Sequence, residues 1–426
     1  MKIYLKKVRT KTLFSMFDPI KVEPLELSYL KTVADEMGHS TSIVDGLFMC
    51  SKAYKNDKSI VPDIVVLTGY NVAENEILKE AKFYKSKYPK AKIIVGGVHI
   101  QLNSTSFHKS YIDYVIHSQS LDSFRTVLNI IQGEKLDVKG FDYRTKDDNW
   151  VIGSKEVISE NEEIYPNREF FNAFRNQIYY LDKKEVALIK GGVGCPYKCS
   201  YCYCRELNGG KYLKASFKNM VREMSSIDTD YFWIVDDVFF ANREDALSFI
   251  EEVRKTKLNK KYIAYLRADF IIKEKDIIKS LKEVGLNEVI IGFEAINEEE
   301  LKSYNKATNA VDYPKVISIL KENHLDYTAL FMVQPSYGFK DFENLYKFIK
   351  KYGIDVFTLS VFTPIKGTKG YDDEKENFVR DDPKYFDFLH LVTKSKLPKI
   401  IFYMLFYGMH IRLLKSRRIR NYLLRR

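Results

Sequence analysis

The sequence has few cysteines, and most of them lie in one place. Five occur among 426 residues, and four of these fall within ten positions: Cys195, Cys199, Cys202 and Cys204. A secreted disulfide scaffold distributes its cysteines along the chain. The clustering therefore argues against a disulfide framework and indicates a metal site in a reducing compartment.

Long apolar runs are also missing. No stretch reaches the roughly 18 consecutive apolar residues that a membrane-spanning helix needs. The start, Met1 to Val8, has neither the apolar core nor the cleavage site of a signal peptide. We therefore expect a cytoplasmic protein. The net charge is +11, but nucleic-acid-binding motifs are absent, so a nucleic-acid partner is not expected.

Acidic residues are missing from the end of the chain. None follows Asp387, whereas residues 411–426 carry seven Lys or Arg side chains, and Ile400 to Ile411 is apolar and aromatic. One interpretation is a peripheral membrane helix or a lid over an apolar substrate. The other, which we favour, is a tail that packs on the preceding domain, closes the substrate cavity and leaves only its last basic turn free.

Strand and helix patterns alternate through residues 1–131. One helix is expected to begin at Pro24, a second to span about 73–88, and a third to end near residue 131. This alternation predicts a doubly wound, Rossmann-like α/β domain, whose ligand should lie beyond the carboxyl ends of the strands. The expected strands are Ile3–Val8, Ser42–Val44, Ile64–Leu67, Ile93–Val95 and Tyr114–Ile116.

A second α/β unit is expected after a connector at 132–182, in which residues 141–145 and 150–152 form a hairpin. Six strand–helix units over 183–372 predict a partial (β/α)6 barrel with its chemistry at the carboxyl-end face. Residues 373–426 are expected to be a helical, basic extension. The predicted barrel strands are 186–190, 231–235, 262–267, 288–293, 327–333 and 355–361.

The cysteine spacing is the most informative motif. Cys195, Cys199 and Cys202 form C-x3-C-x2-C in the run Gly-Cys-Pro-Tyr-Lys-Cys-Ser-Tyr-Cys. Three thiolates so spaced can hold three irons of a 4Fe-4S cluster and leave the fourth iron open to a chelating ligand. A zinc site with Cys204 as fourth ligand is the alternative.

This loop resembles that of the radical S-adenosylmethionine (SAM) superfamily. Tyr201 stands at the family's aromatic position, which implies packing near the SAM adenine. Cys204 is one cysteine more than the family pattern contains, so we expect it either to have no role in the site or to lie on the substrate side. Cys50 and Cys204 should both be dispensable for the cluster.

Later strand ends resemble the cobalamin-binding branch of the same superfamily, in the family's order. Ile234 to Phe239 resembles a DD-x-F strand end, which implies Asp236 and Asp237 near the SAM amino group. The Tyr-Leu-Arg-Ala-Asp run that ends at Asp269 implies that Arg267 pairs with the SAM carboxylate. Helix capping by the two aspartates and an ordinary ion pair of Arg267 are the plainer alternatives.

Three further motifs match the same branch. The Ile-Gly-Phe-Glu run that ends at Glu294 implies that this carboxylate lies near the SAM ribose. Asn305-Lys306 and Phe362-Thr363-Pro364 match the pair and the last strand end that follow in the family.

Residues 1–131 resemble the cobalamin-binding domain of that branch at Pro24–Leu30, Gly38-His39, Pro62–Val66 and Gly96–His99. Paired glycines let a backbone approach a macrocycle closely. A domain that keeps the fold without the ligand is the alternative. The cobalamin-binding residues that the resemblance implies are Thr68, Gly69, Gly96, Gly97, Val98 and His99.

Two departures weaken the resemblance at one edge. The strand after the glycines runs into His117-Ser118-Gln119-Ser120 instead of an acidic turn, and D-x-H-x-x-G is absent. We therefore name no histidine as a cobalt ligand.

The resemblance implies an enzyme with a 4Fe-4S cluster, SAM and cobalamin, reduced by an external donor such as flavodoxin or ferredoxin. The commonest chemistry of the branch is methylation of an unactivated carbon, here of a small-molecule, lipid or peptide substrate. Cobalamin-dependent cyclisation or rearrangement without net methylation is one alternative. A non-catalytic cobalamin or cluster sensor is the other.

Overall fold

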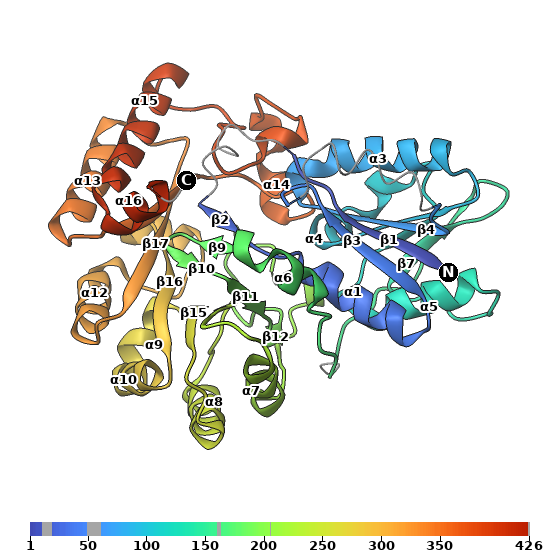
Figure 1. Ribbon diagram of the computed structural model, residues 1–426. Helices are drawn as coiled ribbons and strands as arrows, with labels where there is room; N and C mark the ends of the chain where they lie inside the picture. The colour runs from blue at the N-terminus through green and yellow to red at the C-terminus, as the bar shows by residue number, and fades with distance from the viewer. Residues whose placement is uncertain (11–18, 49–60, 160–162, 205, 425–426) are drawn as a thin grey trace.

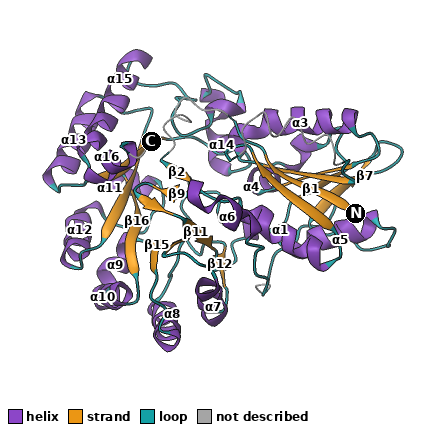
Figure 2. Cartoon of the chain, viewed as in Figure 1, coloured by secondary structure: helices purple, strands orange, loops and turns teal. Residues whose placement is uncertain are grey.

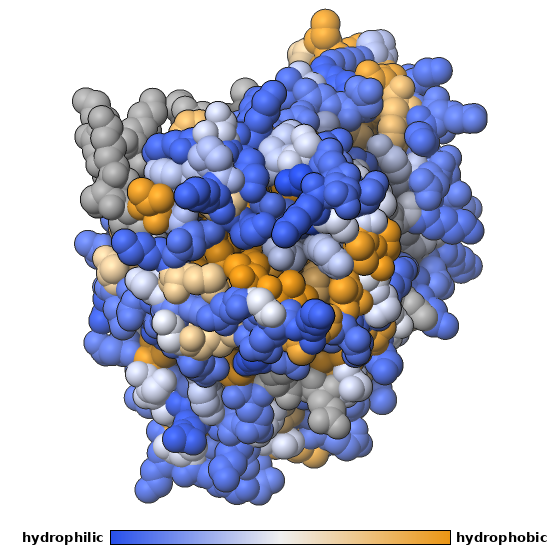
Figure 3. Space-filling model, turned by 90° about the vertical axis from the view of Figure 1, so that its right-hand side faces the viewer, coloured by the Kyte–Doolittle hydropathy of each residue, from blue (hydrophilic) through white to orange (hydrophobic). Residues whose placement is uncertain are grey.

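The computed structural model describes residues 1–10, 19–48, 61–159, 163–204 and 206–424, and Cys50 lies outside them. Two α/β units stand side by side, the first built on a twisted sheet and the second on an open barrel (Figure 1). The face on the side of the first unit is mostly hydrophilic, with hydrophobic side chains showing across its middle (Figure 3).

The first unit contains a seven-stranded sheet of order β3-β1-β4-β5-β6-β7-β8. Strand β4, the middle one of the five parallel strands, is buried along its whole length, as a parallel strand covered on both faces should be. The parallel strands are β1 (Lys2–Lys7), β3 (Ser40–Asp45), β4 (Ile64–Thr68), β5 (Lys92–Gly96) and β6 (Tyr114–Ile116).

Helices cover both faces of this sheet because alternate residues of each strand point to opposite sides. Ile64 and Val66 pack with α1 (Leu25–Glu36) and α5 (Leu121–Ile131). The neighbouring residues, Val65 and Leu67, pack with α3 (Glu74–Lys87) on the other face, where α4 (Val98–Leu102) also lies. This is the doubly wound arrangement that the sequence predicts.

The sheet continues beyond residue 131. Strands β7 (Phe141–Arg144) and β8 (Trp150–Val151) form the expected hairpin, and β7 pairs antiparallel with β6. Asp142 of β7 is buried, with His108 Nε2 2.9 Å and His117 Nε2 3.0 Å from its carboxylate oxygens. The hairpin thus belongs to the first sheet, although the sequence places it in the connector.

The rest of the connector leads into the barrel. It contains α6 (Glu169–Phe174) and the short strands β9 (Tyr179–Tyr180) and β10 (Lys183–Lys184). Strand β9 pairs antiparallel with both β10 and β2 (Ile20–Lys21).

The second unit is an open barrel of six parallel strands in sequence order, with helices on its outside (Figure 2). This confirms the predicted fold class. The strands are β11 (Val186–Ile189), β14 (Tyr231–Ile234), β15 (Lys261–Tyr265), β16 (Leu286–Glu294), β17 (Asp326–Val333) and β18 (Val356–Val361). The helices are α7 (Phe217–Ser226), α8 (Arg243–Thr256), α9 (Ala268–Lys273), α10 (Lys275–Glu283), α11 (Glu298–Ser303), α12 (Tyr313–Glu322) and α13 (Phe339–Lys351).

Residues 362–398, here called the bridging segment, return from the barrel to the first unit and include α14 (Lys369–Glu374). Lys366 of this segment lies 3.0 Å from Glu74 of α3, and Asn71 donates to the Phe386 carbonyl over 2.7 Å. The two units are therefore tied together by polar contacts at the carboxyl ends of the first sheet.

The carboxyl-terminal tail packs on the barrel. Helix α15 (Lys399–His410) buries Phe402 and Phe406, and Phe402 meets Phe342 of α13 edge to face. In the described part of the chain, no helix is long and apolar enough to cross a bilayer. Packing of the tail is thus confirmed.

The rest of that expectation is wrong. Helix α16 (Arg417–Leu423) lies at the amino ends of the barrel strands, opposite the expected face for chemistry. Arg418 donates over 2.6 Å to Glu288, a fully buried residue near the start of β16, and over 3.2 Å to Asp182. As far as residue 424, where the described part of the chain ends, the basic end is therefore anchored through Arg418 rather than free, because a buried carboxylate needs a cationic partner.

Candidate active site

The three-cysteine loop begins and ends on a short hairpin. Strand β12 (Gly192–Val193) pairs antiparallel with β13 (Leu213–Lys214), so the loop leaves and returns at one place beside the carboxyl end of β11. Gly194 follows β12 with φ +77°, and a Cβ there would overlap the Lys211 carbonyl oxygen. Only glycine fits this entry to the loop without strain.

Asp236 holds the start of the loop. Its Oδ1 accepts from the backbone N–H of Gly191 over 2.7 Å and of Gly192 over 3.1 Å, while Lys214 Nζ lies 2.8 Å from Oδ2. The carboxylate is buried and both oxygens have partners within the protein. The sequence predicts that Asp236 contacts SAM. In the structure this carboxylate instead holds the backbone at the start of the loop, a role that the motif did not indicate.

The neighbouring carboxylate, Asp237, faces the end of the cysteine run. Cys204 Sγ lies 3.1 Å from Asp237 Oδ1 and donates to it. Burial raises the pKa of Asp237, and the Cys204 hydrogen bond opposes that rise. Cys204 is therefore already paired with a side chain at the site's edge.

Cys195, Cys199 and Cys202 lie half-buried on one loop. The Cys202 N–H donates to the Cys199 carbonyl over 3.2 Å, which turns the loop between these two cysteines. Burial raises the pKa of the Cys195 thiol to about 11, and the neighbouring thiols Cys199 and Cys202 add to the rise.

Three thiolates on one loop supply the number of protein ligands that a 4Fe-4S cluster with one open iron needs. Among the described residues, no three His, Cys, Asp or Glu side chains converge as ligands of one metal ion. A 4Fe-4S cluster takes each thiolate on a different iron, so its three cysteines need not converge on one point.

The segment after α11 clasps the cysteine loop. The Ser200 N–H donates to the Tyr304 carbonyl over 2.9 Å, and Asn305 Nδ2 donates to the Lys198 carbonyl over 2.9 Å. The Tyr304 ring also meets the Tyr201 ring edge to face, with centroids 5.5 Å apart. The Asn-Lys pair that the sequence singles out therefore positions the loop.

Lys306 joins two predicted SAM contacts. Its Nζ lies 2.8 Å from Glu294 Oε1 and donates to Tyr201 Oη over 3.3 Å. Burial, followed by the Glu294 charge, raises the pKa of Tyr201, so its hydroxyl stays protonated. An ammonium, a carboxylate and a phenol thus meet at the carboxyl end of β16, beside the loop.

The backbone at the end of β16 leaves room for the ion pair between Glu294 and Lys306. Glu294 has φ +65°, and the register of β16 against β17 shifts between Gly292 and Glu294. A Cβ on Gly292 would overlap Glu294 Oε1 and lie 2.8 Å from Lys306 Nζ. The glycine of the Ile-Gly-Phe-Glu motif therefore leaves room for the ion pair.

Arg267, at the end of β15, faces the cysteine loop. Its guanidinium carbon lies 3.6 Å from the centroid of the Tyr197 ring, a residue between the first two cysteines. Its Nε and Nη2 donate to Asp269 over 2.9 and 3.2 Å, and Nη2 also donates to the Ala307 carbonyl. Arg267 therefore faces the cysteine loop, as the resemblance predicts, and it also forms the strand-end ion pair of the plainer alternative.

A cavity of about 350 Å³ lies where the two units meet. It joins the ends of β4 and β5 to the cysteine loop and the bridging segment, so both expected cofactor regions face one space. Its walls are mostly aromatic and aliphatic, which suits exclusion of water. The lining residues are Tyr70, Asn71, Val72, Val98, His99, Leu102, Tyr203, Ile365, Phe386, Asp387 and Phe388.

The predicted cobalamin residues divide into two groups. Val98 and His99 line this cavity. Gly97 has φ +114° instead, and a Cβ on it would overlap Thr68 Oγ1; a Cβ on Gly69 would lie 3.1 Å from the Val8 carbonyl oxygen. These glycines therefore let the strand-end loops pack on each other, a role that the sequence interpretation did not include. Gly96 ends β5 with ordinary space around its Cα.

The two histidines near this face are held by carboxylates. His99 Nε2 lies 2.6 Å from Glu74 Oε2, and Glu74 in turn binds Lys366 of the bridging segment. His117 Nε2 lies 3.0 Å from Asp142. Each histidine therefore has a carboxylate partner within the scaffold of the first unit.

Sequence reasoning missed Lys214, Tyr197 and Lys366. Lys214 neutralises Asp236, Tyr197 stacks on Arg267, and Lys366 links the units through Glu74. Tyr197 could have been suspected because it lies inside the cysteine motif. The two lysines carry no local signal in a chain with 68 Lys and Arg residues.

The family comparison adds independent support for the loop and its barrel. A family model described as the Radical SAM superfamily matches residues 189–349. The chain carries a radical SAM domain. The match begins in β11, just before the cysteine loop, and ends in α13.

Curated proteins that are similar to this chain match it over both units. The hopanoid C-3 methylase of Methylococcus capsulatus is 22% identical over 397 residues, covering 90% of this chain and 75% of that protein. The bacteriochlorophyllide d C-8(2)-methyltransferase of Chlorobaculum tepidum is 21% identical, covering 84% of this chain and 78% of that protein.

Solved structures share the fold. The radical SAM methyltransferase TsrM from Kitasatospora setae, solved with cobalamin and a 4Fe-4S cluster, has a TM-score of 0.70 at 15% identity, covering 93% of this chain and 82% of that one. The cobalamin-dependent radical enzyme OxsB, solved with aqua-cobalamin and SAM, has a TM-score of 0.66 at 15% identity. The match covers 88% of this chain and 55% of the OxsB chain. The two-unit α/β fold is therefore that of cobalamin-binding radical SAM structures.

Proposed function

We propose that this protein is a cobalamin-dependent radical SAM enzyme that methylates an unactivated carbon. One observation supports this most strongly. The cavity between the units is walled by Tyr203 of the cysteine loop on one side and by Val98 and His99 of the first unit on the other. A cluster and a cobalamin held by these two units would therefore serve the same space.

Cys195, Cys199 and Cys202 would hold three irons of the cluster, and the first unit would hold cobalamin beyond the ends of β4 and β5. When bound, these cofactors and SAM supply radical formation and a transferable methyl group. The residues of the chain bind and orient them. The aromatic walls, which include Tyr70 and Phe386, would limit the water around the reacting groups.

Arg267 is placed to orient the SAM carboxylate, since a guanidinium fork suits that group. A carboxylate ligand would share or displace Asp269. Of the two aspartates, Asp237 is better placed than Asp236 to accept from the SAM ammonium, because both oxygens of Asp236 are already used. Glu294, paired with Lys306, would contact the ribose.

An apolar substrate, such as a lipid, fits this site best among the three classes that the sequence leaves open. The cavity walls carry few polar side chains. The two curated relatives described above are named as methylases of a hopanoid and of a bacteriochlorophyllide. A carbon without an acidic proton offers no polar route to methylation, which is the reason for both cofactors.

The test uses SAM with a deuterated methyl group and anaerobically reconstituted, reduced protein. An apolar extract of host cells serves as the substrate source, and mass spectrometry follows labelled products. Labelled methyl in a product, with 5′-deoxyadenosine formed, supports the proposal. Formation of 5′-deoxyadenosine with an altered but unlabelled product would assign cyclisation or rearrangement. Reduced protein that never cleaves SAM would assign the sensor alternative.

A further inference from the structure

Helix α15 is apolar on two opposite faces, and only one of them is covered. Phe402 and Phe406 are fully buried against the barrel. Ile400 and Met404, on the other side, keep 76% and 70% of their surface exposed. Together with Gly408 and Ile411 they form what we call the outer stripe, because positions 0, +4, +8 and +11 share one helical face. A helix that is apolar all round is normally buried on all sides.

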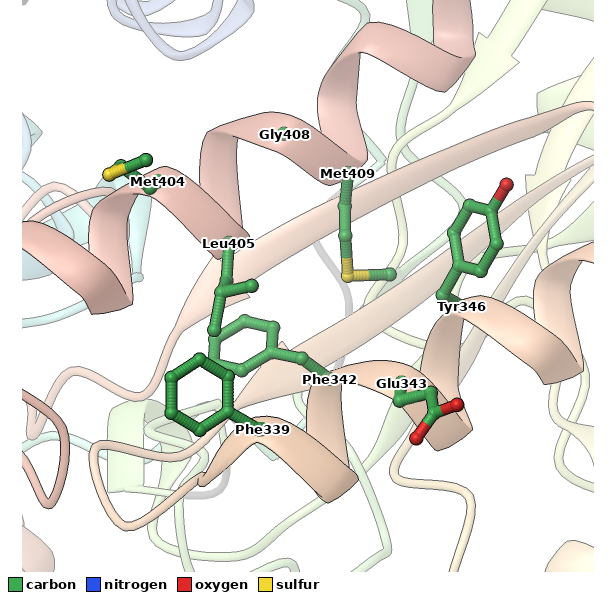
Figure 4. Close-up of a pocket in the computed structure, with 8 residues that line it drawn as sticks. All are labelled: Phe339, Phe342, Glu343, Tyr346, Met404, Leu405, Gly408 and Met409. Carbon is green, nitrogen blue, oxygen red and sulfur yellow. The ribbon is translucent and has the colours of Figure 1, made fainter.

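A groove beside the stripe extends the apolar surface onto α13. It has a volume of about 460 Å³, and Leu405 and Met409 reach from α15 toward Phe342 (Figure 4). Phe339 stands at its edge with 58% of its surface exposed. The exposed apolar surface is thus shared by two helices that are distant in sequence.

The stripe is held in place rather than loosely attached. Ser416 Oγ, just beyond the stripe, donates to Asp355 over 2.8 Å, and Arg418 is bound to the buried Glu288. Before the stripe, the Lys396 N–H donates to the Pro335 carbonyl over 3.0 Å. A tail anchored on both sides presents the stripe outward in a fixed orientation, so binding a partner would order few additional groups.

Basic side chains predominate around the stripe. Acidic residues are absent from the sequence after Asp387. Exposed basic side chains precede and follow the stripe, and they are Lys394, Lys396, Lys399, Lys415, Arg417 and Arg420. The carboxylate at the groove, Glu343 of α13, is neutralised by Lys347 at 2.6 Å.

We propose that the outer stripe and the adjoining groove dock on an anionic lipid surface. An apolar helical face with cations at both ends matches an interface whose outer layer is negative and whose interior is hydrocarbon. The cation excess favours anionic lipid over a second copy of the chain, because two such surfaces would bring like charges together.

Vesicle sedimentation of the holoenzyme tests the proposal. We expect binding to phosphatidylglycerol vesicles, much weaker binding to phosphatidylcholine vesicles, and loss of binding as salt is raised. Each base removed next to the surface should weaken partitioning about fivefold. The double variant Lys399→Glu/Lys415→Glu should therefore lose well over tenfold, and Ile400→Asp/Met404→Asp should abolish binding.

Matched controls carry the same changes elsewhere. Leu247→Asp places a charge on an exposed apolar position of α8, and Lys273→Glu reverses an exposed base of α9. Neither should alter vesicle binding, and SAM cleavage should be unchanged in all four variants.

Equal binding to both vesicle types, or binding that survives Ile400→Asp/Met404→Asp, would overturn the proposal. So would a wild-type dimer, seen by light scattering, that the stripe variant dissociates while vesicles bind neither protein. That outcome would assign the stripe to a second copy of the chain.

Discussion

The guanidinium group of Arg267 stacks on the ring of Tyr197, with 3.6 Å between the guanidinium carbon and the ring centroid. The contact joins the carboxyl end of β15 to the loop between Cys195 and Cys199. A ligand on the open iron of a cluster at this loop would therefore lie within reach of a fixed cation. The stacking also keeps the guanidinium plane in one orientation.

Arg267→Ala should weaken SAM binding while the cluster is retained. Loss of one charge-assisted contact should cost on the order of 1.5–3 kcal/mol, or roughly 10- to 150-fold in affinity. SAM affinity by equilibrium dialysis, with iron and sulfide content measured alongside, checks this. Arg254→Ala, which removes an exposed ion pair with Glu283, is the matched control. Unchanged SAM affinity in the Arg267 variant would remove this residue from the site.

Gly292→Ala should impair the site without unfolding the barrel. The added Cβ would push Glu294 and Lys306 apart, and such overpacking typically costs 1–3 kcal/mol. We expect SAM cleavage to slow by tenfold or more while thermal unfolding shifts by only a few degrees. Gly46→Ala is the control, because the nearest atom to a Cβ there is Arg9 Cγ at 3.9 Å. Full activity of the Gly292 variant would show that the Glu294–Lys306 pair is unimportant.

Cobalamin in this protein should carry no histidine on cobalt. The Nε2 atom of each histidine is bound to a carboxylate, at 2.6 Å between His99 and Glu74 and at 3.0 Å between His117 and Asp142, and His99 Nδ1 lies 3.4 Å from Asn103 Nδ2. Electron paramagnetic resonance of the Co(II) form should show no nitrogen hyperfine splitting from imidazole. Splitting that disappears in His99→Phe or His117→Phe would identify a ligand and contradict this expectation.

Arg418→Ala should destabilise the barrel at neutral pH. Burial by itself would raise the pKa of Glu288, but the charges of Arg418 and Lys183 outweigh it and hold this pKa below its usual value. Removing one partner of such a buried pair costs on the order of 3–5 kcal/mol, and the remaining Lys183 should keep the loss near the lower end. Urea unfolding of the wild type, Arg418→Ala and the exposed-base control Arg420→Ala measures the difference.

The ion pair between Glu288 and Arg418 also makes the free energy of unfolding depend on pH in a predictable direction. Because the folded-state pKa of Glu288 is lowered, its contribution to stability is present above the unfolded value of about 4.3 and is lost as the pH falls through the folded value. The stability gap between wild type and Arg418→Ala should therefore narrow below about pH 4.5. A gap that stays constant between pH 7 and pH 3.5 would mean that Glu288 does not titrate with folding.

Local patterns predicted most of the fold because most parallel strands of both sheets contain a short apolar run, and many of them are followed by a helix. The hairpin β7–β8 was recognised from its turn, but its place in the first sheet was not. Its partner β6 lies more than twenty residues earlier in the chain, and pairing over that distance leaves no mark in either segment. The same holds for α16, whose position depends on Arg418 meeting Glu288 across 130 residues of sequence.

The cysteine loop of the site was predictable because a motif defines it. The roles of the two aspartates were less predictable, because the same residue type serves two purposes there. The cysteine spacing identified the loop that the family comparison also matches. Asp236 and Asp237 looked equivalent in sequence, yet Asp236 binds the Gly191 and Gly192 amides while Asp237 accepts from Cys204. Glycines near β4 and β5 were assigned to a ligand, although Gly97 must be small because of Thr68.

Cluster assembly tests the central claim most directly. Wild type, Cys195→Ala and Cys204→Ala are reconstituted anaerobically, analysed for iron and sulfide, reduced, and supplied with SAM. The account predicts about four irons and four sulfides per chain in wild type and in Cys204→Ala, with cleavage of SAM to 5′-deoxyadenosine, and loss of both in Cys195→Ala. A cluster that survives in Cys195→Ala but is lost in Cys204→Ala would contradict it.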